Sequence, residues 1–135
     1  EYMSETIKFC RKSGYVNNIF GRKTHITGIN DKNFNVRNFQ ERAAINAPIQ
    51  GSASEIMRMA MIRLNDEISD KKNNNLKMLL QIHDELIFEV DEKNIINISK
   101  TIKKMMTSVK DSNLHSFSIP LLVDINSGDN WGQLH

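Results

Sequence analysis

The sequence predicts an α+β fold in which helices pack on one face of a small antiparallel sheet. Residues 76–82 and 86–90 alternate apolar with polar side chains, which is typical of strands with one buried face. Residues 56–68 and 95–109 instead repeat apolar side chains at helical spacing. With 135 residues, of which 39% are hydrophobic, the chain has the size and composition of one soluble, packed domain.

The first part of the chain is predicted to form a helix followed by a hairpin. Residues 1–13 carry apolar side chains among charges and should form a helix that Gly14 ends. Residues 15–20 have the composition of a strand, and residues 24–27 should return beside it. Residues 21–23, Gly-Arg-Lys, supply the turn between them.

A long helical stretch with a break is predicted next. Residues 39–47 contain good helix formers, but Pro48 and Gly51 should interrupt the helix. Ser52 and Glu55 have the spacing of a capping box, so a second helix is expected to begin there. The apolar residues of this second helix should face the core: Ile56, Met57, Ala60, Met61, Leu64 and Ile68.

The second part of the chain should contain a hairpin, a helix and a last strand. In the first strand of the hairpin, Leu76, Met78, Leu80 and Ile82 are expected to share one apolar face. A helix is predicted over 95–109, and a strand over 121–125 that Pro120 begins. The polar run at 70–75 predicts a loop before the hairpin.

Composition and charge exclude several classes of protein. The net charge of +2, from 18 basic and 16 acidic residues, is too small to predict nucleic-acid binding by itself. The single cysteine, Cys10, excludes an internal disulfide framework and a cysteine zinc cluster. Residues 1–5 do not resemble a signal peptide, and every apolar run falls short of the ~20 residues that a membrane-spanning helix needs.

Three ionisable side chains, His83, Asp84 and Glu85, occupy the junction of the predicted hairpin. Adjacent carboxylates repel each other unless a cation balances them, and oxygen ligands on a rigid turn suit Mg²⁺. Such a site fits two-metal phosphoryl transfer. The spacing alone favours a solvated polar turn, because polar turns are common, and that alternative stays open at this point.

A second candidate group consists of Arg42, Asn46 and Gln50: Arg42 and Asn46 are four residues apart and share a helix face, and Gln50 should follow at the broken end of the helix. One cation and two amides on one helix edge can donate to phosphate oxygens and to minor-groove acceptors of DNA. Arg22 and Lys23, in the first turn, could contact a backbone phosphate. The alternative for all of them is a solvent-exposed polar face with ordinary turn charges.

Three segments in order, 41–56, 81–90 and 128–131, resemble the C-terminal end of family A DNA polymerases, the bacterial polymerase I type. The resemblance covers almost the whole chain and implies that the sheet belongs to the polymerase palm. It further implies that His83-Asp84-Glu85 is the catalytic motif C. Asp84 would be a ligand of one of two Mg²⁺ ions, with Glu85 beside the metals and His83 near the primer terminus. Arg42, Asn46 and Gln50 would contact the primer–template duplex along its minor groove.

The resemblance also implies that residues 1–135 are only the C-terminal part of a palm domain. The family's upstream motif A aspartate, its fingers, its thumb and an exonuclease domain have no counterpart in this sequence. The parent protein is expected to synthesise DNA on a template from deoxynucleoside triphosphates, without membrane association. The alternative for the isolated chain is a non-catalytic structural or weak DNA-binding module. The chain is rich in Asn, Lys and Ile, which indicates an AT-rich genome. We expect an intracellular protein, and an organellar (plastid) setting is a hypothesis.

Overall fold

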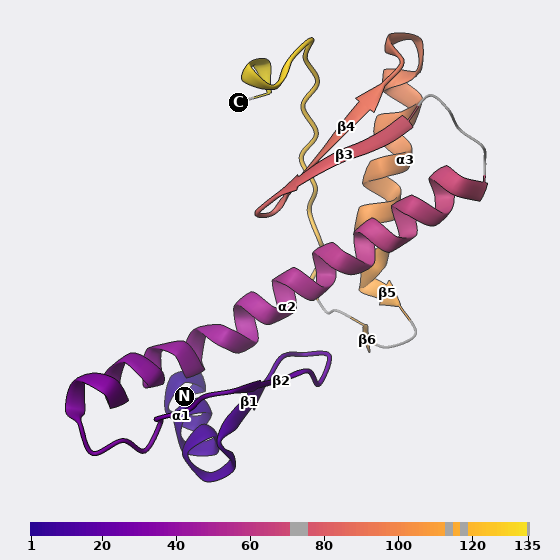
Figure 1. Ribbon diagram of the computed structural model, residues 1–135. Coiled ribbons are helices and arrows are strands. Elements are labelled where there is room, and N and C mark those ends of the chain that lie inside the picture. The colour runs from indigo at the N-terminus through magenta and orange to yellow at the C-terminus, as the bar shows by residue number, and fades with distance from the viewer. Residues whose placement is uncertain (71–75, 113–114, 117–118, 135) are drawn as a thin grey trace. The chain divides into compact units, whose positions relative to one another are not determined.

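The computed structural model describes residues 1–70, 76–112, 115–116 and 119–134. Within these ranges, no helix combines the length and the apolar character that crossing a membrane requires. The polar loop predicted at 70–75 lies outside the described residues except for Asp70, which ends a helix. The fold is α+β, as predicted, but the described strands pair as separate two-stranded antiparallel sheets (Figure 1).

The chain divides into two compact units, Glu1–Glu55 and Ile56–His135. The first unit begins with helix α1, Tyr2–Ser13, and the predicted end at Gly14 is confirmed. Gly14 has a φ of 77°, and its N–H donates to the carbonyl of Cys10, which satisfies one of the last acceptors of the helix. The predicted hairpin follows as β1, Tyr15–Asn17, paired with β2, Lys23–His25.

The core of the first unit joins α1, the hairpin and the start of helix α2, Phe34–Asp70. Five buried side chains make up this core: Cys10, Val16, Ile26, Ile29 and Ala44. Ala43 and Ala47 pack against them from α2. Small side chains on α2 allow its backbone to approach the hairpin closely, which brings the middle of this helix against the turn between β1 and β2.

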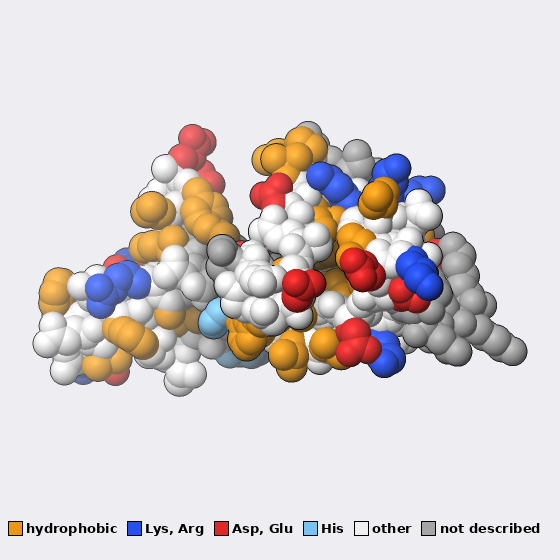
Figure 2. Space-filling view, turned by 90° about the horizontal axis from the view of Figure 1, so that it is seen from above, with side chains coloured by type: hydrophobic (Ala, Val, Ile, Leu, Met, Phe, Trp, Pro, Cys, Tyr) orange, Lys and Arg blue, Asp and Glu red, His pale blue; other side chains and the backbone are white. Residues whose placement is uncertain are grey.

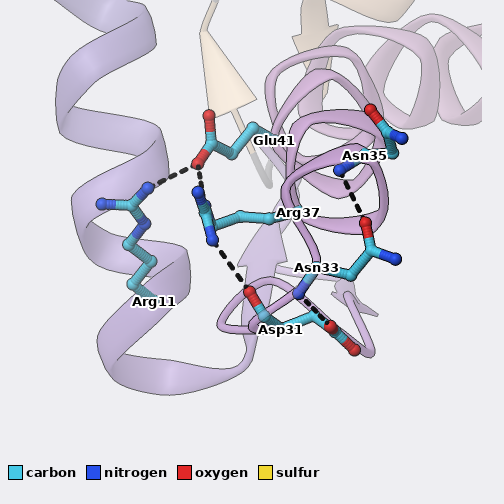
Figure 3. Close-up of polar contacts among 6 residues, drawn as sticks. All are labelled: Arg11, Asp31, Asn33, Asn35, Arg37 and Glu41. Carbon is cyan, nitrogen blue, oxygen red and sulfur yellow. Dashed lines mark hydrogen bonds and ion pairs between the residues drawn. The ribbon is translucent and has the colours of Figure 1, made fainter.

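Ion pairs hold α1 against the first turns of α2 (Figure 3). Arg11 on α1 pairs with Glu41 on α2, and Arg37 Nε lies 4.0 Å from the same carboxylate. Arg37 also donates from Nη1 to the carbonyl of Asp31 at 3.0 Å. One carboxylate thus serves two guanidinium groups, and the loop before α2 is attached to the helix it precedes.

Helix α2 is continuous, so the predicted break at Pro48 is wrong. The side chain of Asn33 accepts from the N–H of Asn35 at 2.9 Å and caps the helix where it begins (Figure 3). Pro48 lies inside the helix, and the predicted capping residue Ser52 is inside it as well. The hydroxyl of Ser52 donates to the Pro48 carbonyl instead of capping a new N-terminus. Proline keeps a helical φ, so contacts that brace the helix can compensate for the hydrogen bond it cannot donate.

In the second unit, the predicted hairpin forms from β3, Leu76–Ile82, and β4, Glu85–Val90. The predicted helix follows as α3, Ile95–Thr107, after a 3-10 turn at Glu92–Asn94. The buried residues Leu64, Leu76, Ile98 and Ile102 join α2, β3 and α3 in one core. The partly buried side chains packed on this core are Ile68, Met78, Leu86, Phe88, Val90, Met105 and Met106.

A bulge in β3 changes which side chains face this core. Met78 lies opposite Phe88, whereas Leu80 lies opposite Ile87, so Leu79 is the extra residue. Beyond a bulge, the alternation of faces shifts by one residue. The prediction that Leu80 shares a face with Leu76 and Met78 is therefore wrong, and Leu80 is 51% exposed.

The last part of the chain has little regular structure among the described residues. Short elements follow α3: a 3-10 turn at Ser108–Lys110, strands β5 (Asp111–Ser112) and β6 (His115–Ser116), and a 3-10 turn at Trp131–Gln133. The strand predicted over 121–125 is absent, which corrects that prediction. A strand requires a hydrogen-bonded neighbour, and the structure describes none for these residues. Leu122 is 88% exposed.

Two glycines should respond in opposite ways to alanine. Gly14 has a positive φ, so Gly14→Ala should destabilise the protein by about 1–2 kcal/mol. Gly51 is inside α2, and an added Cβ would meet Asn18 Cβ at an ordinary 3.5 Å. Gly51→Ala should therefore stabilise by up to about 1 kcal/mol through helix propensity. Urea unfolding of both variants measures this, and the same sign for both would contradict the backbone assignment.

Candidate functional site

The turn between β3 and β4 consists of only two residues, His83 and Asp84. Ile82 and Glu85 pair across the end of the hairpin, so Glu85 belongs to β4 and not to the turn itself. His83 has a φ of 51°, and it is the only residue other than glycine with a positive φ among those described. Such a conformation is uncommon outside glycine and is found often at functional sites. The hairpin thus presents a strained histidine followed by two adjacent carboxylates.

The side chains of His83, Asp84 and Glu85 are all exposed. Gln81, the last but one residue of β3, donates from Nε2 to the His83 carbonyl at 3.4 Å. This contact joins the end of β3 to the first residue of the turn and restrains the backbone immediately before Asp84. The carboxylates consequently extend from a restrained backbone into solvent, where they are accessible to a ligand.

Asp84 and Glu85 fit Mg²⁺ as part of a site. Among the described residues, His, Cys, Asp and Glu side chains do not gather in groups of three or more that could hold a metal ion. Mg²⁺ is usually bound through one or two carboxylates, and it completes its coordination with water and substrate phosphates. Two exposed carboxylates at one turn satisfy that protein contribution, and the remaining ligands would come from elsewhere.

Arg42, Asn46 and Gln50 are exposed on one edge of α2, and the shared face of Arg42 and Asn46 is the one that their spacing predicts. Because the helix continues through Pro48, Gln50 extends the row that Arg42 and Asn46 begin instead of following a broken end. This row belongs to the first unit, whereas the β3–β4 turn belongs to the second. Within its unit, the row offers one cation and two amides in a single line.

Arg22 and Lys23 are exposed, but both have partners within the first unit. Arg22 Nη2 lies 3.1 Å from the carboxylate of Glu55, the residue that was predicted to complete a capping box. The Lys23 ammonium lies 4.4 Å from the centre of the Tyr15 ring, and Lys23 is the first residue of β2. Both cations therefore have a structural role. A phosphate that contacted either of them would have to do so beside Glu55 or Tyr15.

Two polar residues, Asn18 and Ser52, are buried in the described part of the chain. Sequence reasoning missed Asn18 and assigned Ser52 a different role, that of a helix cap. Both connect the β1–β2 turn with α2. An asparagine three residues before Gly21 is a signal for a turn stabilised by its own side chain. No local pattern indicates that the same amide also reaches a helix far along the chain.

Cys10 is fully buried, and this burial raises the pKa of its thiol. A thiol is a nucleophile only as the thiolate, so a raised pKa and lack of access both argue against catalysis.

Charged side chains on the face shown in Figure 2 lie in small groups of both signs, interspersed with hydrophobic ones. On this face, contact with DNA would therefore depend on individual side chains and not on a broad basic surface.

The comparisons with known proteins agree with one another. The model of DNA polymerase family A matches residues 1–133. DNA polymerase I of Streptococcus pneumoniae serotype 4 is 41% identical over 96% of this chain, and DNA polymerase I of Caldicellulosiruptor bescii is 41% identical over 97%. The chain spans only 14% and 15% of those proteins.

A solved structure is similar over almost the whole chain. It is the POL domain of Pol1 from M. smegmatis in complex with DNA primer-template and dNTP. It has a TM-score of 0.89 and 34% sequence identity, and the match covers 98% of this chain and 22% of that one.

Proposed function

This chain belongs to DNA polymerase family A, and on that premise we propose that it is the C-terminal part of the palm of a template-directed DNA polymerase. The reaction would be attack of a primer 3′-hydroxyl on a deoxynucleoside triphosphate, with pyrophosphate as the leaving group. The observation that carries the proposal is the strained two-residue turn that presents Asp84 and Glu85 to solvent. Nothing in the packing of the hairpin requires two carboxylates there, whereas a metal-dependent reaction does.

Asp84 would be a metal ligand in this reaction. Asp84 lies at the tip of a hydrogen-bonded hairpin. The strand pairing and the hydrogen bond from Gln81 to His83 restrain its backbone. Glu85, which is anchored in β4 opposite Ile82, would take the supporting role that membership of the family implies. His83 would lie near the primer terminus. In such a site, Mg²⁺ neutralises charge on the transferred phosphoryl group and lowers the pKa of a bound hydroxyl.

Arg42, Asn46 and Gln50 would bind the primer–template duplex. Amide groups can donate to the minor-groove acceptors that A·T and G·C pairs share, so such contacts tolerate any sequence. Arg42 adds a charge that can pair with a phosphate. Arg22 and Lys23 would add backbone contacts while keeping their partners Glu55 and Tyr15.

For the full-length protein that contains this chain, Asp84→Asn should nearly abolish nucleotide addition. The change is almost isosteric, so the hairpin and duplex affinity should be preserved, whereas one formal charge is lost from the metal site. Single-turnover incorporation should fall by far more than about tenfold, which corresponds to 1.4 kcal/mol of barrier. Glu85→Gln should have a milder effect.

Asp66→Asn is the matched control, because it removes an exposed carboxylate from the same unit without touching the turn. Its rate and duplex affinity should equal those of the unchanged protein. A rate within about tenfold of that protein for Asp84→Asn would mean that Asp84 is not a catalytic metal ligand.

The chain alone should not extend a primer. Its two carboxylates provide only part of a metal site, and a nucleotide-binding helix would have to come from the rest of the polymerase. A primer-extension assay that compares residues 1–135 with the full-length protein tests this expectation. Templated extension by the chain alone, above a buffer control, would show that the site is already complete.

A further inference from the structure

Two buried polar side chains connect the β1–β2 turn with the middle of α2. Asn18 and Ser52 are each 8% exposed. Burial of a polar group costs free energy unless hydrogen bonds replace those to water. Both side chains meet that condition entirely through backbone groups, which indicates that their role is to fix the path of the chain.

Asn18 uses both ends of its amide. Its Oδ1 accepts from the N–H of Phe20 at 3.0 Å and from the N–H of Arg22 at 2.9 Å, which shapes the turn. Its Nδ2 donates to the carbonyl of Gly51 on α2 at 3.3 Å. The turn and the helix are therefore held by opposite ends of one side chain.

Ser52 forms a second bridge between the same two segments. Its hydroxyl accepts from the N–H of Ile19 at 3.1 Å and donates to the carbonyl of Pro48. On the other side of the proline, the hydroxyl of Tyr2 in α1 donates to the carbonyl of Ile45 at 3.0 Å. Side-chain donors thus reach three α2 carbonyls, at Ile45, Pro48 and Gly51, each three residues from the next.

These contacts surround the weakest point of α2. Proline has no N–H to donate to Ala44, and its ring crowds the preceding turn, so an unsupported helix bends or ends there. In this chain α2 continues from Phe34 to Asp70. Side-chain donors therefore bind α2 carbonyls on both sides of the interrupted position, at Ile45 before Pro48 and at Gly51 after it.

The brace lies between members of the proposed duplex-binding row. Arg42 and Asn46 precede Pro48, and Gln50 follows it. A bend at Pro48 would turn Gln50 away from the line of the other two. We propose that Asn18 and Ser52 are positioning residues that keep Gln50 aligned with Arg42 and Asn46 for contact with the duplex. The inference rests on the proposed function, since it assumes that this row binds primer–template DNA.

Asn18→Asp is the sharpest test of this inference. It keeps Oδ1 for the turn but replaces the donor to Gly51 with a carboxylate oxygen that would repel the carbonyl. Ser52→Ala removes the second bridge by deleting one hydroxyl, and it serves as the milder variant if Asn18→Asp folds poorly. Asn17→Asp and Ser54→Ala are matched controls, because they make the same changes at exposed neighbouring residues.

The first measurement is amide hydrogen exchange of the full-length protein without DNA. Asn18→Asp and Ser52→Ala should speed exchange in the turns around Pro48 by roughly threefold to tenfold, the range expected for one lost hydrogen bond. The two controls should leave exchange there unchanged. Unchanged exchange in both test variants would show that the brace does not hold the helix, and would overturn the inference.

The second measurement is primer–template affinity in a double-mutant cycle with Gln50→Ala. Asn18→Asp alone should weaken affinity roughly threefold to tenfold, but should add less than about twofold once Gln50 is absent. Effects that multiply would mean that Asn18 supports the fold without positioning Gln50. If the unchanged protein failed to bind primer–template, the proposed function would fall, and the inference with it. The affinity of the unchanged protein, measured without any variant, distinguishes that outcome from a failure of the inference alone.

Discussion

The continuity of α2 past Pro48 is the constraint on which much of the structure depends. The helix contributes Ala44 to the core of the first unit and Leu64 to that of the second. It also carries Arg42, Asn46 and Gln50 on one exposed edge. Arg42, Asn46 and Gln50 stay in one line only if the helix does not bend at the proline. The polar contacts from α1 and the β1–β2 turn are therefore as important for the row of side chains as the row's own spacing.

The β3–β4 hairpin positions the other candidate group, His83, Asp84 and Glu85, in a different way. The Ile82–Glu85 pair leaves only His83 and Asp84 to make the turn, which forces His83 to a positive φ. Apolar side chains on one face of the hairpin pack against α2 and α3, so the sheet is anchored by its core while its tip stays in solvent. A rigid base with an exposed acidic tip suits metal-dependent chemistry, because the carboxylates need little ordering when a cation binds.

Sequence patterns predicted the elements whose stability is local. Helical spacing identified α3, alternation identified β3 and β4, and Gly14 marked the end of α1. The unbroken α2 was not predictable from local rules, because its support at Pro48 comes from Tyr2 and from the β1–β2 turn. The bulge at Leu79 was likewise invisible in the alternation. For the site, spacing alone favoured a polar turn, and the preference for a metal site came from the resemblance to a family.

The most direct test of the central claim asks whether Asp84 binds the metal itself. In the full-length protein, Asp84→Cys replaces a hard oxygen ligand with a soft sulfur that favours Cd²⁺ over Mg²⁺. Our account predicts that this variant incorporates almost no nucleotide with Mg²⁺ alone and regains activity when Cd²⁺ is added, whereas Asp84→Ala does not. Full activity of Asp84→Cys with Mg²⁺, or an equal response of both variants to Cd²⁺, would contradict it.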